Sequence, residues 1–176
     1  MMKKWNVDAA HSTLGFSVKH MMVSKVRGNF GEFDAHVEAN ETDLTGANIQ
    51  FNIKVPSINT NSADRDNHLR SADFFDAETY PEIKFVANNI TKKGEDKYDI
   101  AGDMTIKDVT KPVVFDAEYE GKGTNPWGQE VVGFTAETKI NRKDFGLTWN
   151  QALETGGVLV GEDVKLSLEI QANPAE

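Results

Sequence analysis

The sequence predicts an all-β protein of about eight strands, arranged as a sandwich or a barrel. Apolar and polar residues alternate one by one in four segments, 47–55, 98–106, 113–119 and 163–172. Such alternation is typical of antiparallel strands that pack one face on a core and expose the other to water. Four of the five prolines fall at strand ends or in turns, where no ladder hydrogen bond is lost.

Weaker alternation completes the order of strands along the chain. The eight expected strands cover 12–20, 26–39, 47–55, 83–91, 98–106, 113–119, 130–140 and 163–172, and a short opening strand is expected at 5–8. Within 26–39 the apolar residues change parity between Phe30 and Phe33, which predicts a bulge or a sharp bend around Gly31. The segment IKDVTKPV is expected to form a tight hairpin connection, and GKGTNPWG a longer loop.

Two segments, 60–80 and 142–156, resist the strand pattern and are expected to form short helices and loops. In the first, Ser62 is a candidate cap for a helical turn, and Ser71 is a candidate cap for a second one. In the second, Gly146 and Gly156, with Gly157 directly after the segment, interrupt a brief alternation of apolar residues. Short helical excursions from an otherwise β fold are therefore predicted at both places.

Composition limits the function classes. No linker, repeat or low-complexity tract divides the 176 residues, so one domain, 1–176, is expected. The net charge of −9 argues against nucleic-acid binding and against broad docking on anionic membranes. No run approaches the ~20 apolar residues of a transmembrane helix. Lys3 and Lys4 are not followed by the apolar segment of a signal peptide, so a cytoplasmic protein is expected.

The charged stretch DRDNHLRSADFFD, residues 64–76, invites a metal-site interpretation that fails. Leu69 replaces the glycine that a calcium loop requires, and Phe75 stands where its bidentate glutamate belongs. Cysteine is absent, and the histidines show no HxH or HxxxH spacing. The four histidines are His11, His20, His36 and His68. No metal and no cofactor are therefore expected.

Catalytic motifs are absent as well. The chain contains no GxSxG, SxxK, HExxH or P-loop sequence, although a serine triad need not be contiguous and stays open. No catalytic residue is predicted, and no enzymatic activity is expected.

Two interpretations remain for 64–76. In the first, the segment is a surface excursion with no ligand: its Arg and Asp side chains pair with one another while apolar residues plug one end of the fold. The pairing residues would be Arg65, Asp66, Arg70 and Asp73, and the plug Leu69, Phe74 and Phe75. In the second, the same segment lines an opening, and Arg65 or His68 contacts the polar end of a ligand.

A ligand is considered because an eight-stranded antiparallel barrel either fills its interior with side chains or holds one small molecule. An elongated apolar channel would suit an aliphatic chain. The residues expected to line it are Phe16, Phe51, Phe74, Phe85, Phe115 and Trp149. The head group of such a ligand would need hydrogen-bond donors that apolar strands lack. The expected donors are Arg65, His68 and Arg70, with Asp66 or Asp73 orienting the guanidinium groups.

The chain resembles the YceI-like family of lipocalin-like proteins almost from end to end. The resemblance is carried by HSTLGFSVKHMMVSKVRGNFGEFDA, RDNHLRSADFFDAETYPEIKF, GDMTIKDVTKPVVF and NRKDFGLTWNQALETGGVLVGEDVKLSLEI. It implies an extended eight-stranded antiparallel lipocalin-like barrel with a long apolar interior, closed near the short helical excursion. It also implies binding of a polyisoprenoid or other long-chain lipid without catalysis, often as a homodimer. Residues 64–76 would form the lid segment at the barrel mouth.

Three functions therefore compete. The first is a lipid-binding module that carries, stores or senses its ligand. The second is an enzyme of isoprenoid or lipid metabolism, and the third is a stress-related interaction domain with a filled core.

Overall fold

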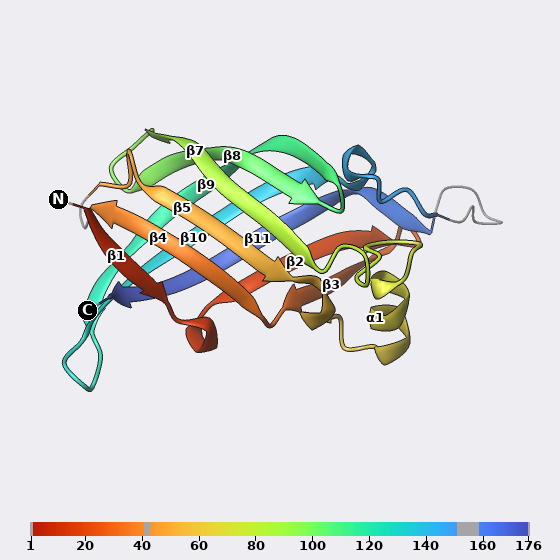
Figure 1. Cartoon of the computed structure of the whole chain (residues 1–176), viewed down its shortest axis with the longest axis horizontal. Coiled ribbons are helices and arrows are strands. Elements are labelled where there is room, and N and C mark those ends of the chain that lie inside the picture. Colours follow the sequence, from red (N-terminus) through yellow and green to blue (C-terminus); the bar gives the residue numbers. More distant parts are fainter. Residues whose placement is uncertain (1, 41–42, 151–158, 176) are drawn as a thin grey trace.

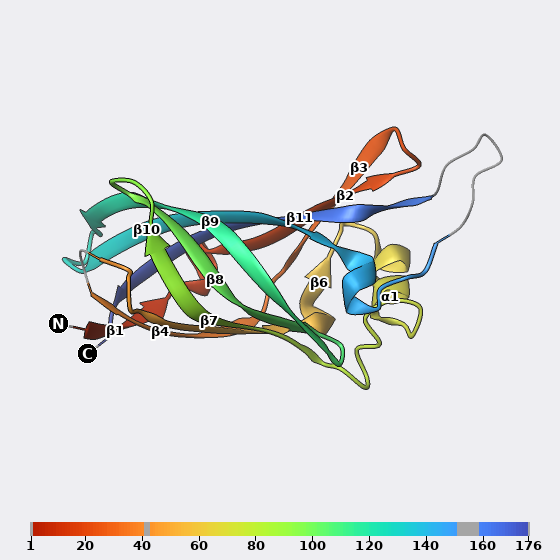
Figure 2. The same cartoon turned by 90° about the horizontal axis from the view of Figure 1, so that it is seen from above.

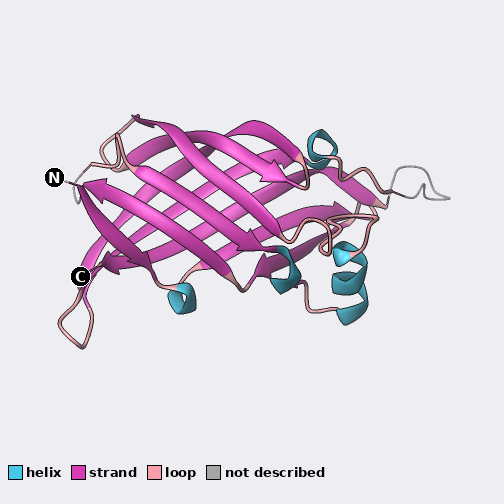
Figure 3. Ribbon diagram, viewed as in Figure 1, coloured by secondary structure: helices cyan, strands magenta, loops and turns pink. Residues whose placement is uncertain are grey.

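The computed structural model describes residues 2–40, 43–150 and 159–175 (Figure 1). Within these residues the chain forms eleven strands, one α-helix and three 3₁₀ turns, and strands dominate the ribbon in Figure 3. The strands are β1 Met2–Val7, β2 Thr13–His20, β3 Ser24–Phe30, β4 Phe33–Asn40, β5 Asn48–Lys54, β6 Ile58–Asn59, β7 Glu82–Lys92, β8 Lys97–Ile106, β9 Val109–Thr124, β10 Glu130–Asn141 and β11 Val160–Pro174. The helix is α1 Ala63–Arg70, and the 3₁₀ turns are η1 Ala9–His11, η2 Val55–Ser57 and η3 Arg142–Phe145.

Eight strands close into an antiparallel barrel. The neighbours follow the order β1-β4-β5-β7-β8-β9-β10-β11, and pairing of β1 with β11 closes the ring. β11 is 15 residues long, so one edge of it holds β10 while the other holds β1 and then β2. Because β2 and β3 continue past the closed ring, the barrel is drawn out on the side of α1 (Figures 1 and 2).

The predicted fold class is confirmed, and one strand boundary is corrected. The segment 26–39 is not one bent strand, since β3 ends at Phe30 and β4 begins at Phe33. The parity change around Gly31 marks the point where the chain leaves its pairing with β2 and joins β5. β6, a two-residue strand that pairs with the end of β3, has too short a pattern to be found in sequence.

The helical prediction for 60–80 is confirmed in α1 and wrong for its second cap. Ser62 begins the helix, with its hydroxyl oxygen accepting a hydrogen bond from the Arg65 amide at 3.4 Å. Ser71 ends the same helix instead of starting another, because its hydroxyl donates to the His68 carbonyl at 2.5 Å. In 142–156 the helical part is η3, which Gly146 ends at a φ of 79°; residues 151–156 lie outside the described residues.

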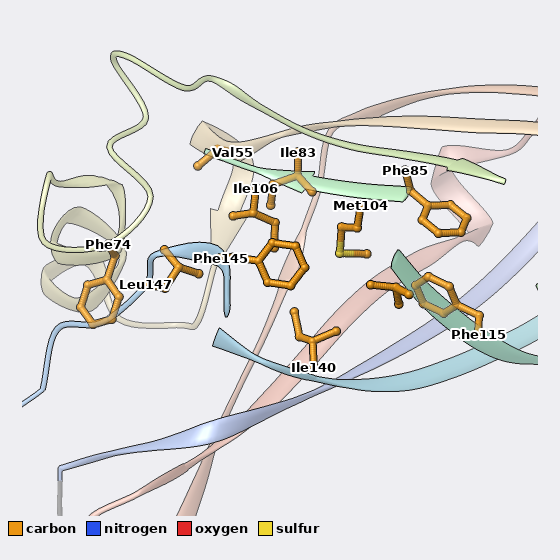
Figure 4. Close-up of a cluster of buried hydrophobic side chains, with 11 residues drawn as sticks. Val55, Phe74, Ile83, Phe85, Met104, Ile106, Phe115, Ile140, Phe145 and Leu147 are labelled. Carbon is orange, nitrogen blue, oxygen red and sulfur yellow. The ribbon is translucent and has the colours of Figure 1, made fainter. Parts of the chain in front are cut away.

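Buried apolar side chains form two clusters, one at each end of the barrel. The cluster nearer α1 contains Val55, Phe74, Ile83, Phe85, Met104, Ile106, Val113, Phe115, Ile140, Phe145 and Leu147 (Figure 4). The cluster nearer the termini contains Trp5, Ala39, Leu44, Ile90, Tyr98, Ala117, Val132 and Ala172. There the Trp5 indole donates to the Ala39 carbonyl at 3.1 Å, which satisfies its only polar atom. In the part of the chain that the structure describes, no helix could cross a membrane.

Candidate functional site

An elongated cavity of about 630 Å³ occupies the barrel interior. Its wall runs from Trp5 and Leu44 at the end with the termini to α1 at the other end. The volume falls within the range of small-molecule sites, roughly 300–1,000 Å³. Many inward residues, such as Leu166 and Leu168, are only half-buried although they point into the barrel, because they face this cavity and not another side chain.

Strand periodicity makes the wall apolar. Every second residue of β11 faces inward, and this strand alone contributes Val164, Leu166, Leu168, Ile170 and Ala172 to the lining. All six aromatic residues predicted from the sequence to line the interior do so: Phe16 on β2, Phe51 on β5, Phe74 after α1, Phe85 on β7, Phe115 on β9 and Trp149 after η3. Their contact with a ligand stays a prediction.

A glycine sets how closely the wall packs near α1. A Cβ on Gly28 would lie 2.6 Å from the Phe16 ring, 2.8 Å from the Thr60 methyl group and 2.9 Å from the Asn59 carbonyl oxygen. The absent side chain therefore lets Phe16 and the strand β6 approach β3. This close approach brings Thr60, and with it the start of α1, against the barrel wall.

At the α1 end three rings meet. The His68 imidazole lies edge-on to Trp149 at 4.7 Å and to Phe74 at 5.1 Å, and Phe74 lies 5.3 Å from Trp149, all between ring centroids. Leu69 and Phe75 also pack on the neighbouring core cluster, and Figure 4 shows Phe74 below the helix beside Leu147. The predicted apolar plug is thus part of the cavity wall, and the two interpretations of 64–76 describe one surface.

Thr60 organises the first turn of α1. Its hydroxyl donates to the Asp66 carboxylate at 2.6 Å and accepts from Arg65 Nε at 2.8 Å. Its backbone N–H donates to the same carboxylate oxygen at 2.9 Å, and its carbonyl accepts from Arg65 Nη2 at 2.8 Å. Thr60 and Asp66 are both buried, so the two charged side chains are linked through one threonine. This arrangement holds Arg65 at the cavity wall.

Two of the four predicted head-group residues line the cavity, and two do not. Arg65 and His68 lie on its wall. Asp66 is held against Thr60, and Arg70 points to the Pro56 and Ile58 carbonyls at 3.1 and 3.3 Å, so neither lies among the lining residues.

The expected pairing of charges within 64–76 is wrong. Thr60 and not Asp66 orients the Arg65 guanidinium, and backbone carbonyls with Asn67 orient Arg70. Asp73 accepts from the imidazole of His68 at 2.9 Å. The physical reason is that each guanidinium reaches carbonyl or hydroxyl oxygens of the segment preceding the helix, which charge spacing within 64–76 cannot reveal.

Sequence reasoning missed Arg142, a buried cation on the cavity wall. Its Nη1 donates to the Leu147 and Trp149 carbonyls at 2.6 and 2.9 Å, and its Nε donates to the Gly161 carbonyl at 2.7 Å. Its Nη2 donates to the Val160 carbonyl at 3.3 Å. Burial lowers the pKa of Arg142, and the charge of Glu162 partly opposes that shift. No sequence signal marked this residue, because its partners are backbone atoms.

Lys19 and His20, at the end of β2, also lie on the wall near α1. His20 follows Leu14, Phe16 and Val18 at a spacing of two, so the alternation of β2 indicates that its side chain faces inward as theirs do.

We call the wall formed by Lys19, His20, Asp64, Arg65, His68 and Arg142 the mouth. Among the described residues of the mouth, three are permanent cations and Asp64 is the one carboxylate. The mouth is therefore cationic in a chain whose net charge is −9.

Groups of three or more His, Asp or Glu side chains that could hold a metal ion do not occur within 2–40, 43–150 and 159–175. The charged and polar groups of the mouth instead border one end of an apolar cavity.

A closed antiparallel barrel with an internal apolar cavity and a polar mouth defines a lipocalin-like binding barrel. The chain belongs to the YceI-like family, whose domain model matches residues 5–172.

Relatives and solved structures agree with this assignment. A UPF0312 protein of Staphylococcus aureus is 40% identical over 176 residues, covering 99% of this chain and 100% of the relative. The crystal structure of Burkholderia cenocepacia BcnA superposes with a TM-score of 0.82 at 25% identity, covering 94% of this chain and 99% of that one. A polyisoprenoid binding domain from Saccharophagus degradans, at 14% identity and a TM-score of 0.70, shares the fold over 98% of this chain and 99% of its own.

Proposed function

We propose that this protein binds a long-chain apolar lipid, a polyisoprenoid or a similar chain, along the axis of its barrel, for carriage, storage or sensing. The observation that carries the proposal is the cavity of about 630 Å³, apolar over its length and cationic only at the mouth. A filled-core interaction domain would have no such space. The structural likeness to a polyisoprenoid binding domain supports the same ligand class.

Burial of the chain supplies the affinity. Each buried CH₂ contributes about 0.8 kcal/mol, so about ten of them contribute on the order of 8 kcal/mol. That gain corresponds to micromolar affinity before the cost of ordering the ligand is subtracted. The apolar wall cannot hydrogen-bond a head group, so the proposal places the head group at the mouth, where the Arg65 guanidinium presents donors and His68 lies on the same wall. Three cations and one carboxylate favour an anionic or amide head.

Native mass spectrometry of the purified protein tests the ligand class. A copurified long-chain lipid is expected; a protein that is empty and also fails to take up added polyisoprenol contradicts the proposal. Incubation of that lipid with the protein tests for chemistry. Conversion by the wild type that is lost in Asp66→Ala or His68→Ala would favour a lipid-metabolising enzyme instead.

The role of the mouth is tested by comparing a polyisoprenyl phosphate with its bare hydrocarbon. Arg65→Ala and His68→Ala are expected to weaken binding of the phosphate and leave binding of the hydrocarbon unchanged. Arg70→Ala is the matched control, because that guanidinium lies in the same helix but outside the cavity wall. Equal losses for both ligands, or none for either, would contradict the head-group role.

A further inference from the structure

The β2–β3 hairpin projects beyond the closed ring of the barrel (Figure 2). β3 pairs with β6 only at Asn29 and Phe30, so among the residues that the structure describes, Ser24–Gly28 have no ladder partner on their outer side. The hairpin also borders the mouth, because Lys19 and His20 line the cavity and the Met21 amide donates to the Leu159 carbonyl at 2.7 Å. Whatever the tip contacts therefore lies next to the mouth.

The tip of this hairpin is apolar and exposed. Met21, Met22 and Val23 are 47%, 56% and 86% exposed. Met21 and Met22 also have φ of 53° and 65°, the left-handed conformation that a type I′ turn requires at both central positions. Asn and Gly adopt that conformation readily, whereas methionine is strained there. Neither turn geometry nor core packing explains apolar residues at these positions.

The strands behind the tip are cationic. From Thr13 to Gly31 the chain has three Lys and Arg residues and no Asp or Glu, although the whole sequence has 28 acidic residues. Lys19 and Lys25 are direct cross-strand partners, and Arg27 follows on the same hairpin. Like charges opposite each other destabilise a sheet. An anionic partner would relieve that repulsion.

We propose that the β2–β3 hairpin docks on the surface of an anionic lipid bilayer, with Met21, Met22 and Val23 entering the headgroup region and Lys25 and Arg27 contacting lipid phosphates. An apolar tip flanked by cations has the chemistry of an interfacial anchor. Salt screens charge interactions beyond about 10 Å, so acidic residues far from the hairpin repel the anionic membrane only weakly. Docking through the hairpin is therefore compatible with the negative net charge of the chain. Docking would set the mouth against the membrane, where a long-chain lipid enters or leaves.

The entry and exit of a long-chain lipid at the mouth rests on the proposed function, whereas the docking of the hairpin does not. Full-length protein is incubated with vesicles of phosphatidylcholine alone or mixed with phosphatidylglycerol, and bound protein is measured by flotation. Binding to the mixed vesicles is expected, together with its loss at high salt. Because each cation near an anionic surface contributes about fivefold, Lys25→Gln with Arg27→Gln should weaken binding roughly 25-fold. Lys84→Gln with Lys139→Gln, two exposed lysines of the barrel wall, should have no effect.

The tip is tested by Met21→Asn with Met22→Gly. This change supplies the preferred turn residues, so the thermal midpoint should rise by about 2–4 °C while vesicle affinity falls about tenfold or more. Trp127→Ser removes an exposed aromatic from the β9–β10 connection at the opposite end and should leave vesicle binding intact.

Three results would overturn the docking proposal. They are absence of binding to mixed vesicles, unchanged binding of both hairpin variants, and salt-independent binding that is equal on both vesicle types. Dimerisation that is lost in the hairpin variants, without any vesicle binding, would assign the hairpin to a second copy of the chain instead. Uptake of polyisoprenol by each variant is measured in parallel. Vesicle binding by a protein that takes up no lipid would leave the docking intact and contradict only the proposed function.

Discussion

At the scale of single residues, Arg142 shows how a buried charge can be held by backbone carbonyls. Its donors reach four backbone carbonyls, which belong to the segment after η3 and to the start of β11. Carbonyl dipoles compensate the guanidinium charge only if the whole set stays in place. Arg142 therefore ties two segments of the mouth together.

Arg142→Met should lower the free energy of unfolding by about 3 kcal/mol, because it leaves several buried carbonyls without donors. Arg142→Lys should recover only part of that loss, since an ammonium group cannot reproduce the planar fork of donors. Urea denaturation measures both. Lys143→Met removes the neighbouring exposed ion pair with Glu162 and should cost no more than about 1 kcal/mol. An equal loss at the two positions would mean that the carbonyl contacts of Arg142 contribute little.

Gly28→Ala should destabilise the fold by about 1–3 kcal/mol and disturb the mouth, because the new methyl group would overlap the Phe16 ring and backbone oxygen of Asn59. Gly123→Ala is the control, since a Cβ at that strand position meets nothing within 4 Å. Thermal unfolding of the two variants compares a crowded glycine with an open one. Identical midpoints would show that β3 can move away from Phe16 at no cost.

At the scale of elements, α1 is held by the segment before it more than by an apolar face of its own. Asp66 is the buried residue of the helix, and its partner Thr60 lies upstream of the cap. The helix can therefore keep its polar sequence and still form part of the cavity wall.

Thr60→Val keeps the shape of the side chain and removes the hydroxyl that joins Arg65 to Asp66. The expected loss of stability is about 2 kcal/mol, because the hydroxyl bonds a buried carboxylate. Binding of the polyisoprenyl phosphate should weaken more than binding of the hydrocarbon, as Arg65 loses its orientation. Thr110→Val, which breaks an exposed hydroxyl pair with Thr105, should change stability by less than about 0.5 kcal/mol. Equal effects at the two threonines would contradict a special role for Thr60.

At the scale of the whole molecule, the cavity exists because inward side chains from all sides of the barrel stop short of one another. Leu168 lies near the middle of β11 and faces this space. Leu168→Trp should fill part of the cavity and weaken uptake of long chains, while the thermal midpoint changes little. Glu169→Trp adds the same ring on the outer face and should bind lipid as the wild type does. Titration with polyisoprenols of increasing length measures the difference, and unchanged uptake by Leu168→Trp would place the ligand elsewhere.

The sequence by itself determined the local structure and the composition of the wall. One-by-one alternation in β5, β8 and β11 assigned strands and chose the residues that face inward, because side-chain direction in a strand has a period of two. The same rule selected Phe16, Phe51, Phe85 and Phe115 for the lining. Ser62 marked the start of α1 because capping is a contact within one turn.

Only the tertiary structure decided which strands close the ring, whether the interior is filled, and what lies at the mouth. β1 closes the barrel against β11 through pairs more than 160 residues apart in the chain, which no local pattern encodes. The orientation of Arg65 and the burial of Arg142 depend on hydroxyl and carbonyl oxygens of other segments. Backbone oxygens are the same in every residue, so the positions of the carbonyls that hold these guanidinium groups follow from the fold and not from residue identity.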